Sequence, residues 1–154
     1  MKTILSITSV LLLLTVSTFA GGKQGWDDNY AKSLEKAKAE GKPALLDFTG
    51  SDWCGWCIKL DDEVFSKSEF KKFAKEKLVL VELDYPHGKR LQKKVQEQNA
   101  ELKGKFKING YPTLILVDGE GKELKRWGGY SKTFLEDLKT AVNGLPSAAK
   151  TAAK

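Results

Sequence analysis

The spacing of hydrophobic residues changes several times along the chain, and each change predicts a different secondary-structure element. Apolar side chains recur at helical spacing in five segments: 27–40, 57–64, a segment beginning at 66, 89–103 and 131–143. Short apolar runs typical of strands occur in four segments: 43–49, 77–84, 113–118 and 122–127. Because these strands alternate with helices before a closing hairpin and helix, we predict an α/β fold with a central mixed β-sheet and helices on both faces.

Polar and small residues at the ends of these segments predict several boundaries. Gly41 is expected to end the first helix. The segment 66–69, with the sequence Ser-Lys-Ser-Glu, has the capping-box pattern of a helix start. A turn at 85–88 precedes the polar helix, and the glycines of 119–121 predict the turn of the hairpin. No segment repeats another, so we expect a single domain.

The first twenty residues have the pattern of a secretory signal peptide. Lys2 supplies a positive start, the segment 4–16 is almost entirely apolar, and small residues within 17–20 end the run. The apolar run is short for a membrane span, which makes an N-terminal membrane anchor the weaker alternative. We therefore predict a signal peptide over 1–20 and a periplasmic or secreted protein with no stable membrane span after cleavage.

The remaining chain has the length of one ordinary domain, which we place at 21–143, followed by a low-complexity tail at 144–154. The whole sequence has 26 Lys and Arg residues against 20 Asp and Glu residues, a formal net charge of +6. The lysines are interleaved with glutamates along the predicted helices, as in "EKAKAEGK". This arrangement favours a solvated basic surface, and we expect no nucleic-acid partner.

The only two cysteines, Cys54 and Cys57, lie between a predicted strand and a predicted helix. The free N–H groups and partial positive charge at a helix start favour a thiolate at the first cysteine. Their spacing within one helical turn brings the two sulfurs close enough to form a disulfide. We therefore predict a redox pair in which Cys54 is the nucleophile and Cys57 the resolving thiol, with no cofactor other than their own disulfide.

Two other interpretations of this pair are weaker. A tetrahedral metal site would need further ligands, and the chain has no other cysteine and a single histidine, His87, so we expect no metal. A structural staple is the other alternative, but a disulfide that closes so short a loop removes little chain entropy. His87 itself is expected to be a loop residue.

Three blocks of sequence around and after the cysteines resemble the thioredoxin superfamily. They are the active-site segment "LLDFTGSDWCGWCIKL", the cis-proline segment and hairpin "INGYPTLILVDGEGKEL", and the glycine turn and final helix "WGGYSKTFLEDL". These blocks occur in the family's order. The chain is more similar to secreted bacterial thioredoxin-like proteins, and to the periplasmic C-terminal domain of DsbD, than to cytosolic thioredoxin. The resemblance implies a thioredoxin-like fold for the domain at 21–143.

The same resemblance implies where a substrate would bind. Pro112 is the implied cis-proline beside the cysteines, which leaves the backbone of Tyr111 free to pair with an extended substrate segment. Gly128 and Gly129 would let the substrate backbone approach from the other side, and Trp53 would flank the first sulfur. An ordinary trans proline at the strand start and a Trp53 buried in the core are the alternatives.

A buried carboxylate near the cysteine pair is also implied by the resemblance. It makes Asp47, near the end of the first strand, the group that takes the proton of the resolving thiol, with a pKa raised by burial. The loop to the first cysteine is one residue longer than in thioredoxin, so an Asp47 that faces water is the alternative. Glu82 in the neighbouring strand is a second candidate for the proton relay.

Gly55 and Trp56, between the cysteines, bear on the direction of electron flow. Gly-Pro is typical of reducing thioredoxins and a second-position histidine of oxidases and isomerases, whereas Gly-Trp matches neither. We predict a thiol-disulfide oxidoreductase that reduces or isomerises disulfides of substrate proteins and receives electrons from an upstream thiol donor. Gly55 and the aromatic residues Trp53, Trp56 and Tyr111 are expected to contact the substrate. The alternative is a redox-sensitive peptide-binding or chaperone-like adaptor with little turnover.

Overall fold

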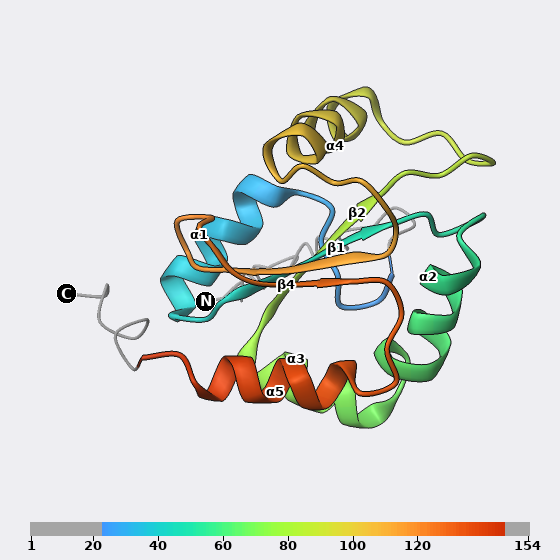
Figure 1. The fold of residues 1–154 in the computed structure, drawn as a ribbon. Helices are drawn as coiled ribbons and strands as arrows, with labels where there is room; N and C mark the ends of the chain where they lie inside the picture. The colour runs from blue at the N-terminus through green and yellow to red at the C-terminus, as the bar shows by residue number, and fades with distance from the viewer. Residues whose placement is uncertain (1–22, 147–154) are drawn as a thin grey trace, which may run out of the picture.

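The computed structural model describes residues 23–146, in which helices cover both faces of a four-stranded sheet (Figure 1). The strands are β1 (Ala44–Thr49), β2 (Val79–Asp84), β3 (Thr113–Val117) and β4 (Glu123–Gly128). The helices are α1 (Tyr30–Glu40), α2 (Gly55–Leu60), the π-helix η1 (Asp61–Phe65), α3 (Ser68–Lys77), α4 (Lys93–Lys105) and α5 (Phe134–Asn143). The predicted signal peptide at 1–20 lies outside the described residues, as does the predicted tail from 147 onward.

The sheet has the strand order β2-β1-β3-β4, with β1 between its parallel and its antiparallel neighbour. β1 runs parallel to β2 and antiparallel to β3, which in turn pairs antiparallel with β4. A parallel pair requires a long crossover connection, and α2, η1 and α3 supply it between β1 and β2. The predicted mixed sheet with helices on both faces is therefore confirmed.

Side chains of β1 alternate between two hydrophobic cores. Leu45 packs with Phe70 of α3 in the core on one face, where α3 and α5 lie (Figure 1). Phe48 packs with Leu102 of α4 in the core on the other face, where α1 and α4 lie. Because successive residues of a strand point to opposite faces, Asp47 shares the face of Leu45. This places a carboxylate within an apolar layer.

The first helix begins later than its hydrophobic pattern predicts. It begins at Tyr30 rather than at 27, because the Asn29 side chain accepts a hydrogen bond from the backbone N–H of Lys32 (3.0 Å) and caps the helix. Gly41 ends the helix as predicted, in the left-handed conformation with φ of 61°. The local cap therefore decides where the helix starts.

The predicted helix at 89–103 is shifted to Lys93–Lys105. Residues 85–92 instead form a loop, which is tied to the segment before the cysteines. The hydrophobic spacing in this region could not show the difference, because the contacts that hold the loop come from residues more than thirty positions earlier. This loop forms one side of the site described below.

The capping-box prediction at 66–69 is wrong. The Ser66 hydroxyl donates a hydrogen bond to the Asp62 carbonyl (2.8 Å) instead of capping the following helix. The residue at the N-cap of α3 is Lys67, whose side chain has no oxygen that could accept a cap hydrogen bond. The cause is η1, which continues the helical backbone of α2 through Phe65, so that Ser66 belongs to the end of that helix.

Candidate active site

The two cysteines lie where the chain passes from β1 into α2, and their sulfurs are joined in a disulfide bond. Cys54 is the N-cap residue of α2, and its sulfur accepts a hydrogen bond from the backbone N–H of Cys57 (3.2 Å). Cys54 is 7% and Cys57 5% exposed. In the reduced protein the same N–H group would favour a thiolate on Cys54. The predicted pair thus stands at a helix start.

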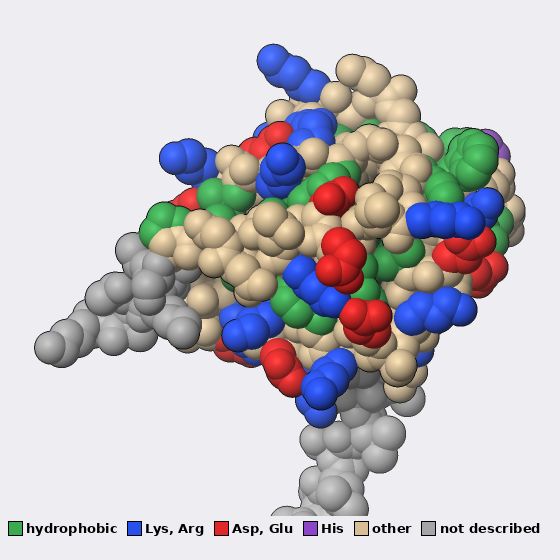
Figure 2. All heavy atoms as spheres, turned by 60° about the horizontal axis from the view of Figure 1, so that its bottom comes forward, with side chains coloured by type: hydrophobic (Ala, Val, Ile, Leu, Met, Phe, Trp, Pro, Cys, Tyr) green, Lys and Arg blue, Asp and Glu red, His purple; other side chains and the backbone are tan. Residues whose placement is uncertain are grey.

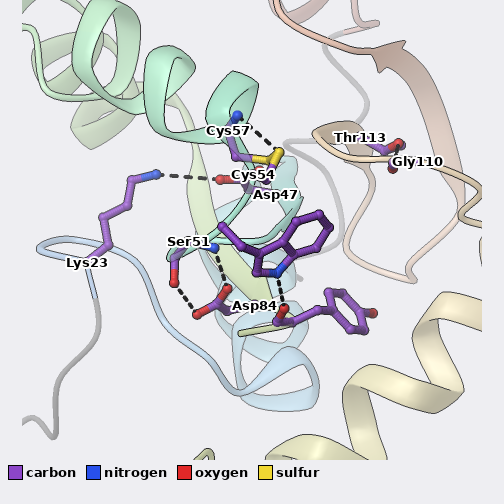
Figure 3. Close-up of a disulfide and its surroundings, with 10 residues drawn as sticks. Lys23, Asp47, Ser51, Cys54, Cys57, Asp84, Gly110 and Thr113 are labelled. Carbon is purple, nitrogen blue, oxygen red and sulfur yellow. Dashed lines mark hydrogen bonds and ion pairs between the residues drawn. A yellow bond between two sulfur atoms is a disulfide. The ribbon is translucent and has the colours of Figure 1, made fainter. Parts of the chain in front are cut away.

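The loop before β3 lies opposite the disulfide (Figure 3). Its Tyr111–Pro112 peptide bond is cis, and the Thr113 hydroxyl donates a hydrogen bond to the Gly110 carbonyl (2.8 Å). The Pro112 carbonyl accepts a hydrogen bond from the backbone N–H of Gly129 (2.8 Å). This bond joins the loop before β3 to the loop after β4, so the fold brings together the proline and the glycines that the sequence indicated.

The two glycines leave this edge of the site open. Gly128 is paired with Thr113 at the end of the β3–β4 hairpin. A Cβ atom placed on Gly128 or Gly129 would meet no other atom of the described chain within 4 Å, and Gly129 has φ of 75°. Another polypeptide backbone can therefore approach here.

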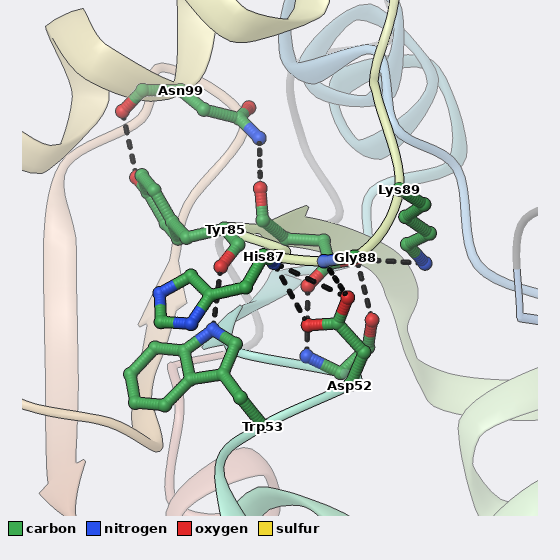
Figure 4. Close-up of polar contacts among 9 residues, drawn as sticks. Asp52, Trp53, Tyr85, His87, Gly88, Lys89 and Asn99 are labelled. Atoms are coloured by element: carbon green, nitrogen blue, oxygen red, sulfur yellow. Dashed lines mark hydrogen bonds and ion pairs between the residues drawn. The ribbon is translucent and has the colours of Figure 1, made fainter.

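Trp53 is 42% exposed, so the alternative of a core tryptophan is wrong. Its indole Nε1 donates a hydrogen bond to the Tyr85 carbonyl (2.7 Å), and its ring stacks on His87 with centroids 4.5 Å apart (Figure 4). It also meets the Tyr111 ring edge-on at 5.7 Å. Gly50 makes this position possible, because a Cβ atom there would come within 2.5 Å of the indole. His87 lies in a loop, as predicted, and forms part of an aromatic cluster.

Trp56, between the two cysteines, is 59% exposed. Its ring stacks on Tyr130, with centroids 5.7 Å apart, and the Lys59 ammonium lies over both rings. Among residues 23–146, four large hydrophobic side chains are exposed: Trp53, Trp56, Ile58 and Leu124. The first three lie within one residue of a cysteine, so exposed apolar surface is concentrated around the disulfide.

Asp47 is 2% exposed, so the alternative of an aspartate that faces water is wrong. Figure 3 shows its carboxylate next to the cysteine pair. Burial raises the pKa of Asp47 to about 6, against the opposing effect of the nearby Lys23 ammonium. The Lys23 Nζ atom lies 3.5 Å from Asp47 Oδ2, while Oδ1 has no hydrogen-bond partner in the described part of the chain. This carboxyl can therefore exchange a proton near neutral pH.

Glu82 and Asp61 complete the charged surroundings of Asp47. Glu82 is its register partner on β2, and burial raises the pKa of Glu82 as well, again opposed by Lys23. Asp61 of η1 lies 2.6 Å from the Lys23 ammonium. One ammonium thus faces three carboxylates from three different elements. Sequence reasoning found Asp47 and Glu82 but missed Lys23, because this lysine lies in no recognisable motif.

Two further aspartates that the sequence analysis missed hold the loops around Trp53 (Figure 4). Asp52 accepts hydrogen bonds from the backbone N–H groups of His87 (3.0 Å) and Gly88 (2.6 Å). Asp84 accepts hydrogen bonds from the backbone N–H (2.9 Å) and the hydroxyl (2.7 Å) of Ser51. The loop after β2 is therefore fixed against the segment that leads to the cysteines. The signal in the sequence that could have indicated these contacts was the presence of short polar residues on either side of the two loops.

The charged side chains of the described chain do not gather as metal ligands would. Within the range 23–146, no three His, Cys, Asp or Glu side chains form a group that could hold a metal ion. The cysteine sulfurs are bonded to each other. In the same range, no helix has both the length and the apolar character needed to cross a membrane.

The sequence matches the family model of the thioredoxin-like domain over residues 30–140. The chain therefore belongs to the thioredoxin-like family, and the resemblance seen in its motifs is confirmed. With its Cys-x-x-Cys disulfide and the relatives described next, it is an enzyme of the thiol-disulfide oxidoreductase class.

Two proteins of Chlamydia pneumoniae are close relatives. The disulfide bond reductase DsbH is 42% identical over 118 residues, which cover 75% of this chain and 71% of DsbH. The thioredoxin-related protein DsbJ is 34% identical over 136 residues, which cover 84% of this chain but only 39% of DsbJ. The thiol:disulfide interchange protein DsbD of Yersinia pestis is 32% identical over 91 residues, which cover 57% of this chain and 13% of DsbD.

Solved structures agree with this relationship. The structure of the DsbH oxidoreductase superimposes with a TM-score of 0.71 at 38% identity, covering 89% of this chain and 96% of that one. The C-terminal domain of DsbD from Neisseria meningitidis superimposes with a TM-score of 0.54 at 18% identity, covering 72% and 90%. The second likeness concerns the fold alone. The chain is thus similar to DsbD in sequence and to the C-terminal domain of DsbD in fold, as predicted.

Proposed function

We propose that the protein reduces or isomerises disulfide bonds of substrate proteins outside the cytoplasm. The observation that carries this proposal is the position of the Cys54 sulfur, at the start of α2 and beside the Tyr111–Pro112 loop. A thiolate is favoured there, next to backbone groups with which an extended substrate can pair. The names of the relatives agree with it, since DsbH is called a disulfide bond reductase and DsbD a thiol:disulfide interchange protein.

The chain organisation that this proposal requires follows the sequence patterns. Residues 1–20 act as a signal peptide, residues 21–143 form the catalytic domain, and residues 144–154 are a tail. A signal peptide delivers the domain to the periplasm or the exterior, where disulfide bonds form and persist. An upstream thiol donor must then keep the cysteine pair reduced.

The proposed reaction is two successive thiol-disulfide exchanges. The Cys54 thiolate attacks one sulfur of the substrate disulfide, a mixed disulfide forms, and the other substrate sulfur leaves with the electron pair and takes up a proton. Cys57 then loses its proton and attacks the Cys54 sulfur, which releases the first substrate sulfur as a second thiol. The enzyme is left with the Cys54–Cys57 disulfide. Two electrons and two protons from the donor thiols restore the reduced pair.

Asp47 is the proposed acceptor of the Cys57 proton. Its burial beside the cysteine pair, its pKa of about 6 and its unpartnered Oδ1 atom within the described chain support this role. Glu82 is the second candidate, because it is the register partner of Asp47 on β2 and its charge helps to raise the pKa of Asp47.

The proposed substrate site surrounds the disulfide on both sides. The backbone of Tyr111, beside Pro112, pairs with an extended segment of the substrate, and the open edge at Gly128 admits its backbone. The exposed aromatic side chains of Trp53 and Trp56 supply apolar contact. The Gly55 backbone between the cysteines completes the list of proposed substrate contacts.

Insulin reduction with a thiol donor tests the proposal. We expect the wild-type protein to accelerate precipitation of the insulin B chain, Cys57→Ser to accumulate a mixed disulfide with insulin, and Cys54→Ser to do neither. A reduction potential near or below about −230 mV would mark a reductase and one near −120 mV an oxidant. An inactive wild-type protein that still binds peptide, as Cys54→Ser also does, would favour the adaptor alternative instead.

A further inference from the structure

A cavity of about 770 Å³ opens next to the proposed substrate site. Its lining includes Trp53 and Tyr111, which flank the disulfide, and extends to Gln96 and Lys103 of α4. The two α4 residues are separated by about 10 Å along the helix axis, the length of roughly three residues of extended chain. The cavity therefore begins where a substrate would react and continues along α4.

The cavity has a positive lining. Three cationic side chains contribute to it, Lys89, Arg90 and Lys103, against a single carboxylate, Asp84. Lys89 pairs with Asp84 at 2.8 Å, so these two charges offset each other. Arg90 and Lys103 form no ion pair with any residue of the range 23–146. Two positive charges beside the site are thus without a carboxylate partner in the described chain.

The walls of the cavity are aromatic and held in place. The Lys103 ammonium lies 5.6 Å from the ring centroid of Tyr85 and 5.4 Å from that of Tyr111. The Tyr85 hydroxyl donates a hydrogen bond to the Asn99 carbonyl (2.6 Å), and the Asn99 side chain donates one to the Asp84 carbonyl (2.9 Å) (Figure 4). A ligand would therefore enter a preformed site and lose little energy in ordering it.

We propose that this cavity binds an acidic segment of the substrate polypeptide, next to the cysteine that Cys54 attacks. The inference rests on the proposed function and names its substrate class. Carboxylates of the segment pair with Arg90 and Lys103, while its apolar atoms cover the rings of Tyr85 and Tyr111. The occupant is a polypeptide, because the cavity is longer than one residue and reaches Tyr111, whose backbone is the proposed pairing edge for an extended substrate.

The opposite face of the molecule provides a matched control. Figure 2 shows basic and acidic side chains interspersed over the face formed by α3 and α5. Lys71 and Lys72 lie exposed on α3. Their replacement by glutamate changes the net charge of the protein by the same amount as replacement of Arg90 and Lys103 by glutamate, but far from the cavity.

The test uses three disulfide peptides with one shared cystine core and acidic, neutral or basic flanking residues. We expect a kcat/KM for the acidic peptide about three- to tenfold above that for the neutral one at low salt, falling as salt is added. Arg90→Gln with Lys103→Gln should abolish the preference, and the corresponding double change to Glu should reverse it. All these variants should reduce the neutral peptide normally, and Lys71→Glu with Lys72→Glu should keep the preference.

Four results would overturn the proposal. Equal kcat/KM values for the three peptides would exclude an acidic subsite, while leaving the reductase function intact. If the Lys71 and Lys72 control lost the preference for the acidic peptide to the same extent, that preference would be an effect of net charge and not of the cavity. An effect of the Gln variants on glutathione disulfide alone would identify a small anionic ligand instead. A wild-type protein that reduces none of the peptides would contradict the proposed function itself, and the subsite with it.

Discussion

The Lys23 ammonium lies 3.5 Å from the buried Asp47 carboxylate, and this ion pair joins the N-terminal segment to β1 below the disulfide. The same ammonium lies over the rings of Trp26 (4.3 Å) and Phe65 (4.2 Å), which hold it within an otherwise apolar layer. A positive charge at this place favours the ionised form of Asp47 and offsets part of the cost of its burial. The proton affinity of the proposed relay thus depends on a residue 24 positions away in the sequence.

Lys23→Met should shift the pH dependence of catalysis. Removal of the ammonium leaves Asp47 facing only the carboxylates of Asp61 and Glu82, so its pKa should rise above about 6. If ionised Asp47 takes the Cys57 proton, the pH of half-maximal kcat/KM for insulin reduction should move upward.

The matched control for this change is Lys36→Met, which removes an exposed lysine of α1 that pairs with Glu40. Its pH profile should coincide with that of the wild-type protein. If Lys23→Met gives the same profile as Lys36→Met, the Lys23 charge is not coupled to proton transfer at the cysteine pair.

Asp47→Asn should change how stability depends on pH. The pKa of Asp47 is about 6 in the folded protein, against 3.8 for the free side chain. The folded state therefore binds the proton more tightly, and this stabilisation is complete below the lower value and lost as the pH rises through the higher one. Between these limits the wild-type protein should lose up to about 3 kcal/mol of unfolding free energy that the Asn variant does not lose.

Urea unfolding of the oxidised protein, at several pH values between about 4 and 8, measures this difference, since the disulfide keeps the cysteines from titrating. Parallel curves of unfolding free energy against pH for the two proteins would show that Asp47 does not carry a raised pKa.

Gly50→Ala should disturb the site through Trp53. The added Cβ atom would come within 2.5 Å of the indole, so Trp53 must move and lose its hydrogen bond to the Tyr85 carbonyl. We expect a loss of about 1–3 kcal/mol in unfolding free energy and slower insulin reduction. Gly104→Ala in α4 is the control, because its Cβ meets nothing within 4 Å in the described chain and should be neutral or stabilising. Equal stability of the two variants would contradict the close approach of Trp53 to Gly50.

Trp56→Ala should weaken the reduction of protein substrates without unfolding the protein. Because the side chain is 59% exposed, its removal should change the unfolding free energy by no more than about 0.5 kcal/mol. A central aromatic contact is worth more than about 1 kcal/mol in binding, so kcat/KM for insulin should fall about fivefold or more. A small neutral disulfide should be reduced as before. Leu124 is an exposed apolar residue of β4, and Leu124→Ala serves as the control. An equal fall in kcat/KM for insulin in this variant would show that Trp56 has no special role.

Local patterns in the sequence were sufficient for most of the fold. The strand predicted at 43–49 is observed at Ala44–Thr49, and the one at 77–84 at Val79–Asp84, because strands buried on both faces produce continuous apolar runs. The end of the first helix at Gly41 could also be predicted from the sequence, since it depends on the conformational freedom of one residue. The starts of the helices were harder to predict from the sequence. For example, α4 starts late because Asp52, which is distant in sequence, binds the preceding loop.

The residues of the site also divide into those that the sequence predicted and those that only the packing decided. Cys54, Cys57 and the Tyr111–Pro112 segment could be read from motifs, since their chemistry needs those residue types in that order. The sequence left open whether Asp47 is buried or faces water, and whether Trp53 is core or surface. Both questions were answered by the tertiary packing, because the burial of a side chain depends on which other segments of the chain pack against it.

By itself, therefore, the sequence determined the elements, their order and the redox pair, all of which arise from interactions between residues near in the chain. Only the tertiary structure decided that Lys23 reaches Asp47 and that Glu82 stands beside it in the sheet. It also decided that Arg90 and Lys103 line one cavity with the aromatic flank of the disulfide. The physical reason is that the electrostatic surroundings of a buried or surface charge are set by residues distant in sequence, which only the folded chain brings within a few ångströms.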